Sequence, residues 1–132
     1  MTLVDTNLLI DLFEGDPRWA PWSAKALSEA AAVGPLLIND VVFAELSVGF
    51  SQYEACEVFL AELRIEVAPT PRAALFAAGK AFQAYRRQGG SRTGVLPDFF
   101  IGAHAAVAGL PLLTRDPRRY RAYFPDLALI AP

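Results

Sequence analysis

Four acidic residues in this chain lie where a predicted strand ends or inside an otherwise apolar stretch. Their local sequences are LVDTNLL, VVFAELSVG, VLPDFFIGA and LLTRDPRR, and the acids are Asp5, Glu45, Asp98 and Asp116. A carboxylate surrounded by Val, Ala and Phe is costly unless an opposite charge compensates it. No lysine is adjacent to any of the four, and only Asp116 has a neighbouring arginine. If the fold gathers these acids, a divalent metal ion is the simplest compensating charge, which predicts metal-dependent phosphodiester chemistry.

Helix capping is an alternative explanation for three of these acids. Asp5 could cap a helix that begins directly after it, because aspartate is a favoured N-cap. Asp98 follows a proline in the predicted first turn of a helix, where a carboxylate interacts favourably with the helix dipole. Asp116 precedes Pro117, as a cap precedes a first helical proline. Taken singly, each of the three is explained by capping as well as by catalysis.

Glu45 does not fit the capping explanation. Its neighbours at helical spacing are Val41, Val42 and Val48, so it points along an apolar face that holds no cation. Asp40 directly precedes the same helix and is expected to be its N-cap rather than part of a site. The metal interpretation therefore depends on four acids, from four separate elements, that meet near one edge of a sheet.

Two neutral residues could support the acids. Strand alternation places Thr114 on the same side as Asp116, so its hydroxyl could orient a carboxylate or a metal-bound water. Asn7 stands two residues beyond Asp5 and could do the same, although either residue could equally be an ordinary cap. His104 is the only histidine. Because one histidine cannot build a zinc site, a structural role within a helix is expected for it.

The pattern of apolar residues predicts an α/β fold. Short apolar runs predict strands at Thr2–Asp5, Leu36–Asn39, Ile65–Ala68, Leu112–Thr114 and Ala128–Ile130. Helical periodicity or Ala-rich composition predicts helices at Asn7–Phe13, Pro17–Val33, Asp40–Phe50, Tyr53–Leu63, Pro71–Gln88 and Pro97–Ala108. Strands that alternate with helices indicate a parallel sheet covered on both faces, with ligands outside the C-terminal strand ends. Asp5 and Asp116 are both expected at that edge.

Length and composition indicate one compact folded domain spanning residues 1–132. The chain is 54% hydrophobic and 20% charged, which excludes a disordered protein. The single cysteine, Cys56, excludes an internal disulfide and fits a reducing cytosol. No basic segment precedes the first strand, and no apolar run reaches ~18 residues. A soluble cytoplasmic protein without membrane association is expected.

The net charge of −2 conceals a strong asymmetry between the halves of the chain. Residues 1–66 contain three Lys/Arg and eleven Asp/Glu, whereas residues 67–132 contain nine Lys/Arg and three Asp/Glu. A basic half of this kind suggests a face that could bind a polyanion. In the alternative, the basic residues simply solvate the outer side of a helix: Arg72, Lys80, Arg86 and Arg87 all lie on the predicted helix 71–88.

Three segments of the sequence resemble the signature blocks of the PIN-domain nucleases, and most of all those of VapC toxins from prokaryotic toxin–antitoxin pairs. They are LVDTNLLIDLF, NDVVFAELSVGF and LPDFFIGAHAAVAGLPLLTRDPRRYRAYFP. By this resemblance the four acids match the family's acidic quartet, and Thr114 matches the hydroxyl residue before its last acid. The chain departs from some relatives at Arg118, Arg119 and Tyr120, where they carry a further Asp or Asn. The number of metal ions, one or two, therefore stays open.

The resemblance implies a PIN-like three-layer fold and a Mg²⁺- or Mn²⁺-dependent endoribonuclease that cuts selected cellular RNA, such as tRNA or rRNA. Asp5 and Asp98 would hold the metal, Asp116 would be the next ligand, and Glu45 would ligate it or orient the attacking water. A VapB-type antitoxin would neutralise the toxin by covering an apolar groove and the acidic pocket, and would alone contact DNA. A homodimer is also expected, since apolar residues on amphipathic helices offer surface for symmetric pairing.

Two rival functions remain on the sequence alone. One is a catalytically inactive binding module with the same fold, in which the acids merely cap helices. The other is a metal-dependent phosphohydrolase that acts on small phosphate esters. The basic C-terminal half favours a polymeric substrate over a small one.

Overall fold

The computed structural model describes residues 1–132, and its centre is a five-stranded, wholly parallel sheet in the order β3-β2-β1-β4-β5. The strands are β1 (Thr2–Val4), β2 (Leu36–Asn39), β3 (Ile65–Ala68), β4 (Leu112–Leu113) and β5 (Leu129–Ile130). The helices are α1 (Thr6–Glu14), α2 (Ala20–Val33), α3 (Asp40–Ser47), α4 (Tyr53–Glu62), α5 (Arg72–Arg87), α6 (Pro97–Ala108) and α7 (Arg118–Tyr123). The predicted α/β fold, a parallel sheet flanked by helices, is confirmed.

The strand order reverses at β1, which lies between β2 and β4. Parallel strands of this kind open a crevice at their C-terminal ends, where the connections leave in opposite directions. Leu3 is paired with Leu112 and Val4 with Leu113, so the residues that follow the two strands end at the same level. This register is what brings Asp5 and Thr114 together.

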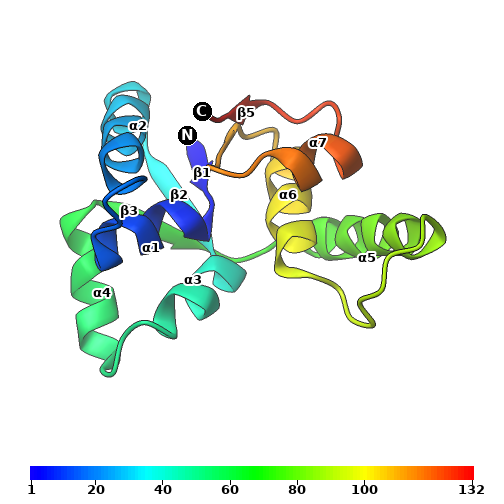
Figure 1. The fold of residues 1–132 in the computed structure, drawn as a ribbon, viewed down its shortest axis with the longest axis horizontal. Coiled ribbons are helices and arrows are strands. Elements are labelled where there is room, and N and C mark those ends of the chain that lie inside the picture. Colours follow the sequence, from blue (N-terminus) through cyan, green and yellow to red (C-terminus); the bar gives the residue numbers. More distant parts are fainter.

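The three central strands are buried because their side chains are almost all apolar, as is typical of a parallel sheet covered on both faces. A second, smaller cluster lies away from the sheet between α5 and α6, and consists of Ala74, Ala78, Ala81, Phe99 and Ala103. The four alanines of this cluster let the two helices approach closely. Figure 1 shows the result: α5 extends from α6 on the side of the molecule opposite α4.

The predicted strands agree with the structure to within two residues at each end, and six of the helices were predicted. The seventh helix, α7, was not among the predicted elements. Its sequence, RRYRAY, is too short and too basic to show an apolar period. No helix combines the length and the apolar composition that a membrane crossing requires.

The predicted cap of α3 is wrong, and the capping alternative for Asp116 does not hold either. Asn39, not Asp40, caps α3, because its side-chain oxygen accepts a hydrogen bond from the Val42 amide at 2.9 Å. Asp40 is the first helical residue, and its carboxylate accepts a hydrogen bond from the Thr70 hydroxyl. Asp116 does not cap α7 either, since Pro117 occupies the N-cap position.

Candidate functional site

One pocket collects all four of the acids singled out in the sequence. It lies at the C-terminal ends of β1 and β4 and has a volume of about 220 Å³. We call it the acidic pocket; its lining residues are Asp5, Thr6, Asn7, Ile10, Glu45, Asp98 and Asp116. The acids come from the end of β1, from α3, from the first turn of α6 and from the loop after β4.

Asp5 is the most buried of the four acids, with 5% of its surface exposed. It leaves β1 in an extended conformation and caps α1, because its Oδ1 accepts a hydrogen bond from the Thr6 amide at 2.7 Å. Its Oδ2 accepts from the Thr114 hydroxyl at 2.7 Å and from the Tyr120 hydroxyl at 2.9 Å. Burial raises the pKa of Asp5 to about 6, against these hydrogen bonds and with a further contribution from the charge of Asp98.

Thr114 and Asn7 join the two strand ends. The Thr114 hydroxyl donates to the Asp5 carboxylate and also accepts a hydrogen bond from the Asp116 backbone amide at 3.1 Å, so it connects the Asp5 carboxylate to the backbone of Asp116. The Asn7 amide nitrogen lies 3.4 Å from both Asp5 Oδ2 and Thr114 Oγ1, and its oxygen accepts the Arg115 amide at 3.3 Å. Neither residue caps a helix, so the capping alternative does not apply to them.

Glu45 is half-buried on α3 and reaches across to α1, where its Oε1 accepts a hydrogen bond from the Thr6 hydroxyl at 2.7 Å. No cation pairs with it, as its apolar neighbours in the sequence predicted. The other carboxylate oxygen, Oε2, has no protein donor, and Glu45 is one of the residues that line the pocket.

Asp98 and Asp116 are paired with arginines. Arg119 donates from Nη1 to Asp98 Oδ2 at 3.1 Å. Arg118 donates two hydrogen bonds to Asp116, from Nε to Oδ1 at 3.0 Å and from Nη2 to Oδ2 at 3.2 Å. The sequence showed an arginine beside Asp116 only; the partner of Asp98 comes from α7, 21 residues further along. Burial raises the pKa of Asp98 against the opposing charge of Arg119, whereas hydrogen bonding from Arg118 lowers the pKa of Asp116.

Sequence reasoning missed Tyr120 and Thr6 as parts of the site. Tyr120 is 1% exposed, and its buried hydroxyl donates to Asp5, which together with burial raises the tyrosine pKa well above its usual value. Its position as the only buried residue of RRYRAY depends on how α7 packs, so no local pattern identifies it. Nothing in the local sequence marks Thr6 as part of the site. His104 is buried in α6 outside the pocket, and burial lowers its pKa.

An ion pair between the buried Asp11 and the half-buried Arg115 fixes the loop that carries Asp116. Arg115 Nε lies 2.9 Å from Asp11 Oδ2, without the alignment of a hydrogen bond, and Ser23 donates to the same oxygen at 2.9 Å. The Arg115 guanidinium also lies over the Trp19 ring, 5.2 Å from its centroid. The loop after β4 is thereby tied to both α1 and α2.

The donor set of the acidic pocket suits a hard divalent cation. Its side chains offer carboxylate, hydroxyl and amide oxygens, which Mg²⁺ and Mn²⁺ prefer, and Mg²⁺ keeps several waters of its own. As they stand, no three acidic or histidine side chains are close enough to share a metal ion. Asp98 and Asp116 are instead turned to Arg119 and Arg118, and like-charged carboxylates stay apart without a cation.

A family model described as PIN domain matches residues 2–125. The chain belongs to the PIN-domain family. The resemblance noted in the sequence is thus confirmed at the level of the family. A comparison with curated protein sequences gives no significant match.

Solved structures with the same fold come from VapBC toxin–antitoxin complexes. A chain of VapBC2 from Rickettsia felis, bound to a fragment of promoter DNA, superposes with a TM-score of 0.75 at 20% identity, over 99% of this chain and 98% of that one. VapBC-1 from nontypeable Haemophilus influenzae gives 0.73 at 22% identity, over 98% and 96%. DNA-bound VapBC from Salmonella typhimurium gives 0.70 at 22% identity, over the same shares. At these identities the similarity establishes the fold.

Proposed function

We propose that this chain is the toxin of a type II toxin–antitoxin pair and a Mg²⁺- or Mn²⁺-dependent endoribonuclease acting on selected cellular RNA, tRNA or rRNA. The observation that carries the proposal is the convergence of four carboxylates, from four separate elements, on one pocket at the crossover edge of the sheet. Membership of the PIN family supports it.

The four acids divide between two roles in this mechanism. Asp5, Asp98 and Asp116 would hold the ion, which supplies charge stabilisation for the phosphoryl oxygens and acidifies a bound water. Glu45, whose free oxygen faces the pocket, would orient the attacking water and accept its proton. Thr114 and Tyr120 both donate to Asp5 Oδ2 and so keep that carboxylate in place.

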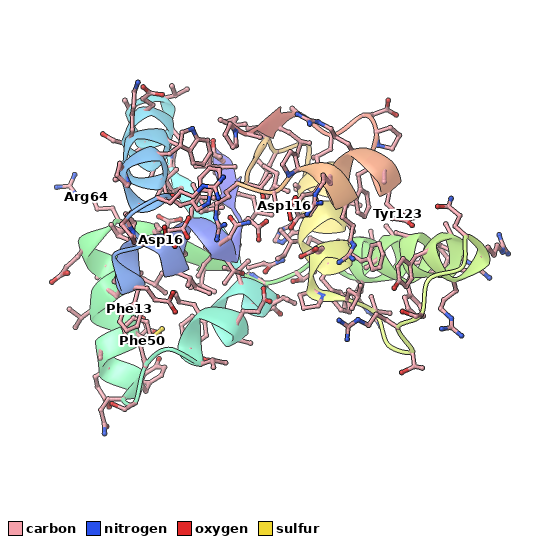
Figure 2. The ribbon with its side chains drawn as sticks, in the orientation of Figure 1. Phe13, Asp16, Phe50, Arg64, Asp116 and Tyr123 are labelled. Carbon is pink, nitrogen blue, oxygen red and sulfur yellow. The ribbon has the colours of Figure 1, made fainter.

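A VapB-type antitoxin is the proposed partner, because the structural neighbours are VapBC complexes. An aromatic cluster of Phe13, Phe50 and Phe59 offers it an apolar docking surface between α1, α3 and α4. Figure 2 shows Phe13 and Phe50 side by side. Phe13 and Phe50 are 4.4 Å apart by ring centroid, and Phe13 is 44% exposed. Contact with DNA would occur only through the antitoxin, and the proposed compartment is the cytoplasm.

One observation favours the rival function of a catalytically inactive binding module. Asp5 does cap α1, and Asp98 and Asp116 each have an arginine partner, so three acids already make structural contacts. Substitution separates the two functions. In the nuclease, Asp5→Asn and Asp98→Asn abolish Mn²⁺-dependent cleavage of RNA, whereas the exposed Asp40→Asn keeps the wild-type rate. The size expected for losing a metal ligand is on the order of 100-fold or more.

The measurement is the cleavage rate of total tRNA and rRNA by purified protein, with and without Mn²⁺. Wild-type rates in both Asp5→Asn and Asp98→Asn would show that the acids do not form a catalytic site. Hydrolysis of a small phosphate ester such as p-nitrophenyl phosphate, without cleavage of RNA, would favour the phosphohydrolase instead.

A further inference from the structure

A second pocket adjoins the acidic pocket and shares two acids with it. We call it the tyrosine–arginine pocket; it has a volume of about 430 Å³, and its lining residues are Tyr85, Asp98, Asp116, Arg118, Arg119 and Tyr123. Its size lies within the range of about 300–1,000 Å³ that is usual for pockets that bind small ligands. Figure 2 shows Asp116 near the middle of the molecule and Tyr123 on the side toward α5.

The aromatic wall of this pocket is held rigidly. The rings of Tyr85 and Tyr123 have centroids 6.2 Å apart, and both pack edge-on against the buried Phe99. Gly90 lies directly on Tyr85, where a Cβ atom would come within 2.2 Å of the ring. The Tyr123 hydroxyl donates to Gln88 Oε1 at 3.2 Å. A wall fixed in this way can receive a planar group without reorganising.

The charged side of the pocket consists of two guanidiniums. The Arg118 side chain is 87% exposed, and Arg119 is 40% exposed and lies 5.9 Å over the Tyr85 ring centroid. Both are now neutralised by Asp116 and Asp98. Any divalent cation that took over these two carboxylates would leave both guanidiniums free for an anion. Their planar donor forks match the oxygens of a phosphate.

We propose that the tyrosine–arginine pocket binds the nucleotide next to the cleaved phosphodiester of a single-stranded RNA. The base lies against Tyr85 and Tyr123, and the adjoining phosphate binds Arg118 and Arg119. A base can reach an aromatic ring only when it is unpaired, so the substrate region is a loop or a single strand. This inference rests on the proposed function, because it takes the acidic pocket as the place of cleavage.

The test is binding of a short fluorescein-labelled single-stranded RNA, measured by fluorescence anisotropy in Mg²⁺. The background is Glu45→Gln, which keeps the three expected metal ligands while removing the residue that orients water. Arg118→Ala, Arg119→Ala and Tyr85→Leu should each weaken binding about fivefold or more. The two arginine variants should also reduce the salt dependence, log Kd against log salt, by about 0.7 each.

Arg72→Ala is the matched control, since it removes the same charge from an exposed site at the far end of α5, roughly 20 Å from Tyr85 along the helix axis. Affinities in all three variants that fall no further than in Arg72→Ala would overturn the inference. Arg118→Ala keeps the test decisive even if Tyr85→Leu disturbs folding, because the Arg118 side chain is exposed.

Cleavage by the wild-type chain separates this inference from the proposed function. If the wild type binds RNA through Arg118 but does not cut it in Mg²⁺ or Mn²⁺, the pocket stands and the nuclease fails. If it cuts RNA while the variants bind as Arg72→Ala does, the pocket fails and the nuclease stands.

Discussion

The Asp5 carboxylate is buried, yet it accepts hydrogen bonds from Thr6, Thr114 and Tyr120. Desolvation outweighs these donors, so the pKa of Asp5 rises to about 6. A metal ion that binds this carboxylate must displace a proton below that pH. Metal affinity is therefore expected to fall as the pH drops below about 6, which is a stronger pH dependence than an unperturbed aspartate would give.

The same pKa predicts how stability depends on pH without metal. The folded state holds the Asp5 proton more tightly than the unfolded chain does, so the contribution of Asp5 to stability is fully present below pH 3.8 and is lost as the pH rises through about 6. The loss amounts to about 3 kcal/mol. Asp5→Asn removes it, and asparagine caps a helix as well as aspartate does.

Thermal unfolding in EDTA between pH 4 and pH 7 measures this effect. The unfolding temperature of Asp5→Asn minus that of the wild type should increase by at least about 5 °C over this range. Comparing the two proteins cancels the contribution of His104, whose lowered pKa acts with the opposite sign because stability is lost as the pH falls. A difference that does not change with pH would contradict the burial of a charged Asp5.

At the scale of elements, α7 has the largest influence on the site. It supplies Arg119 to Asp98 and Tyr120 to Asp5, and Arg118 to the neighbouring Asp116. The contacts of Arg119 and Tyr120 could not be predicted from the sequence, since they depend on how a six-residue helix packs on α6.

The strand ends, by contrast, could be predicted because local sequence marks them. Short apolar runs end sharply at Asp5 and at Asn39, so the edge of the sheet is marked in the sequence itself. The adjacent pair Asn39–Asp40 shows the limit of such reasoning. Both residue types cap helices well, and which one does so depends on where β2 turns into α3.

The ion pair between Arg119 of α7 and Asp98 should compete with a metal ion for the Asp98 carboxylate. Arg119→Ala should raise the affinity for Mn²⁺ about two- to fivefold, because the metal no longer has to displace a half-exposed ion pair from Asp98. Arg121→Ala is the control: it removes the same charge from an exposed position on the same helix. Calorimetric titration with Mn²⁺ measures the affinity of both variants. Equal affinities would show that Arg119 does not compete with the metal for Asp98.

The whole molecule divides by charge at the acidic pocket. The acidic half of the sequence forms β1 to β3 with α1 to α4, and the basic half forms β4 and β5 with α5 to α7 (Figure 1). Asp5 and Glu45 reach the pocket from the first half, and Asp98 and Asp116 from the second. An RNA that approached from the basic half would meet the carboxylates at its edge.

Exposed apolar residues on α5 support the expected homodimer. Leu75 is 43% exposed and Phe76 is 69% exposed, beside a groove of about 510 Å³ between α5 and α7. Symmetric pairing is the commonest way to bury such surface. Light scattering at micromolar concentration should give a dimer for the wild type and a monomer for Phe76→Asp. Val33→Asp, a similar change at an exposed position on α2, should stay dimeric.

Two outcomes of the scattering experiment would contradict the dimer. A wild-type chain that is monomeric at micromolar concentration would exclude it, and a dimer that persists in Phe76→Asp would place the interface away from α5.

Titrating Mn²⁺ into the metal-free protein at neutral pH tests most directly whether the four acids form a metal site. We expect saturable binding to the wild type and to Asp40→Asn, whose carboxylate lies outside the pocket. Asp5→Asn and Asp98→Asn should lose that binding by on the order of 10- to 100-fold. Equal Mn²⁺ affinity in all four proteins would contradict the account.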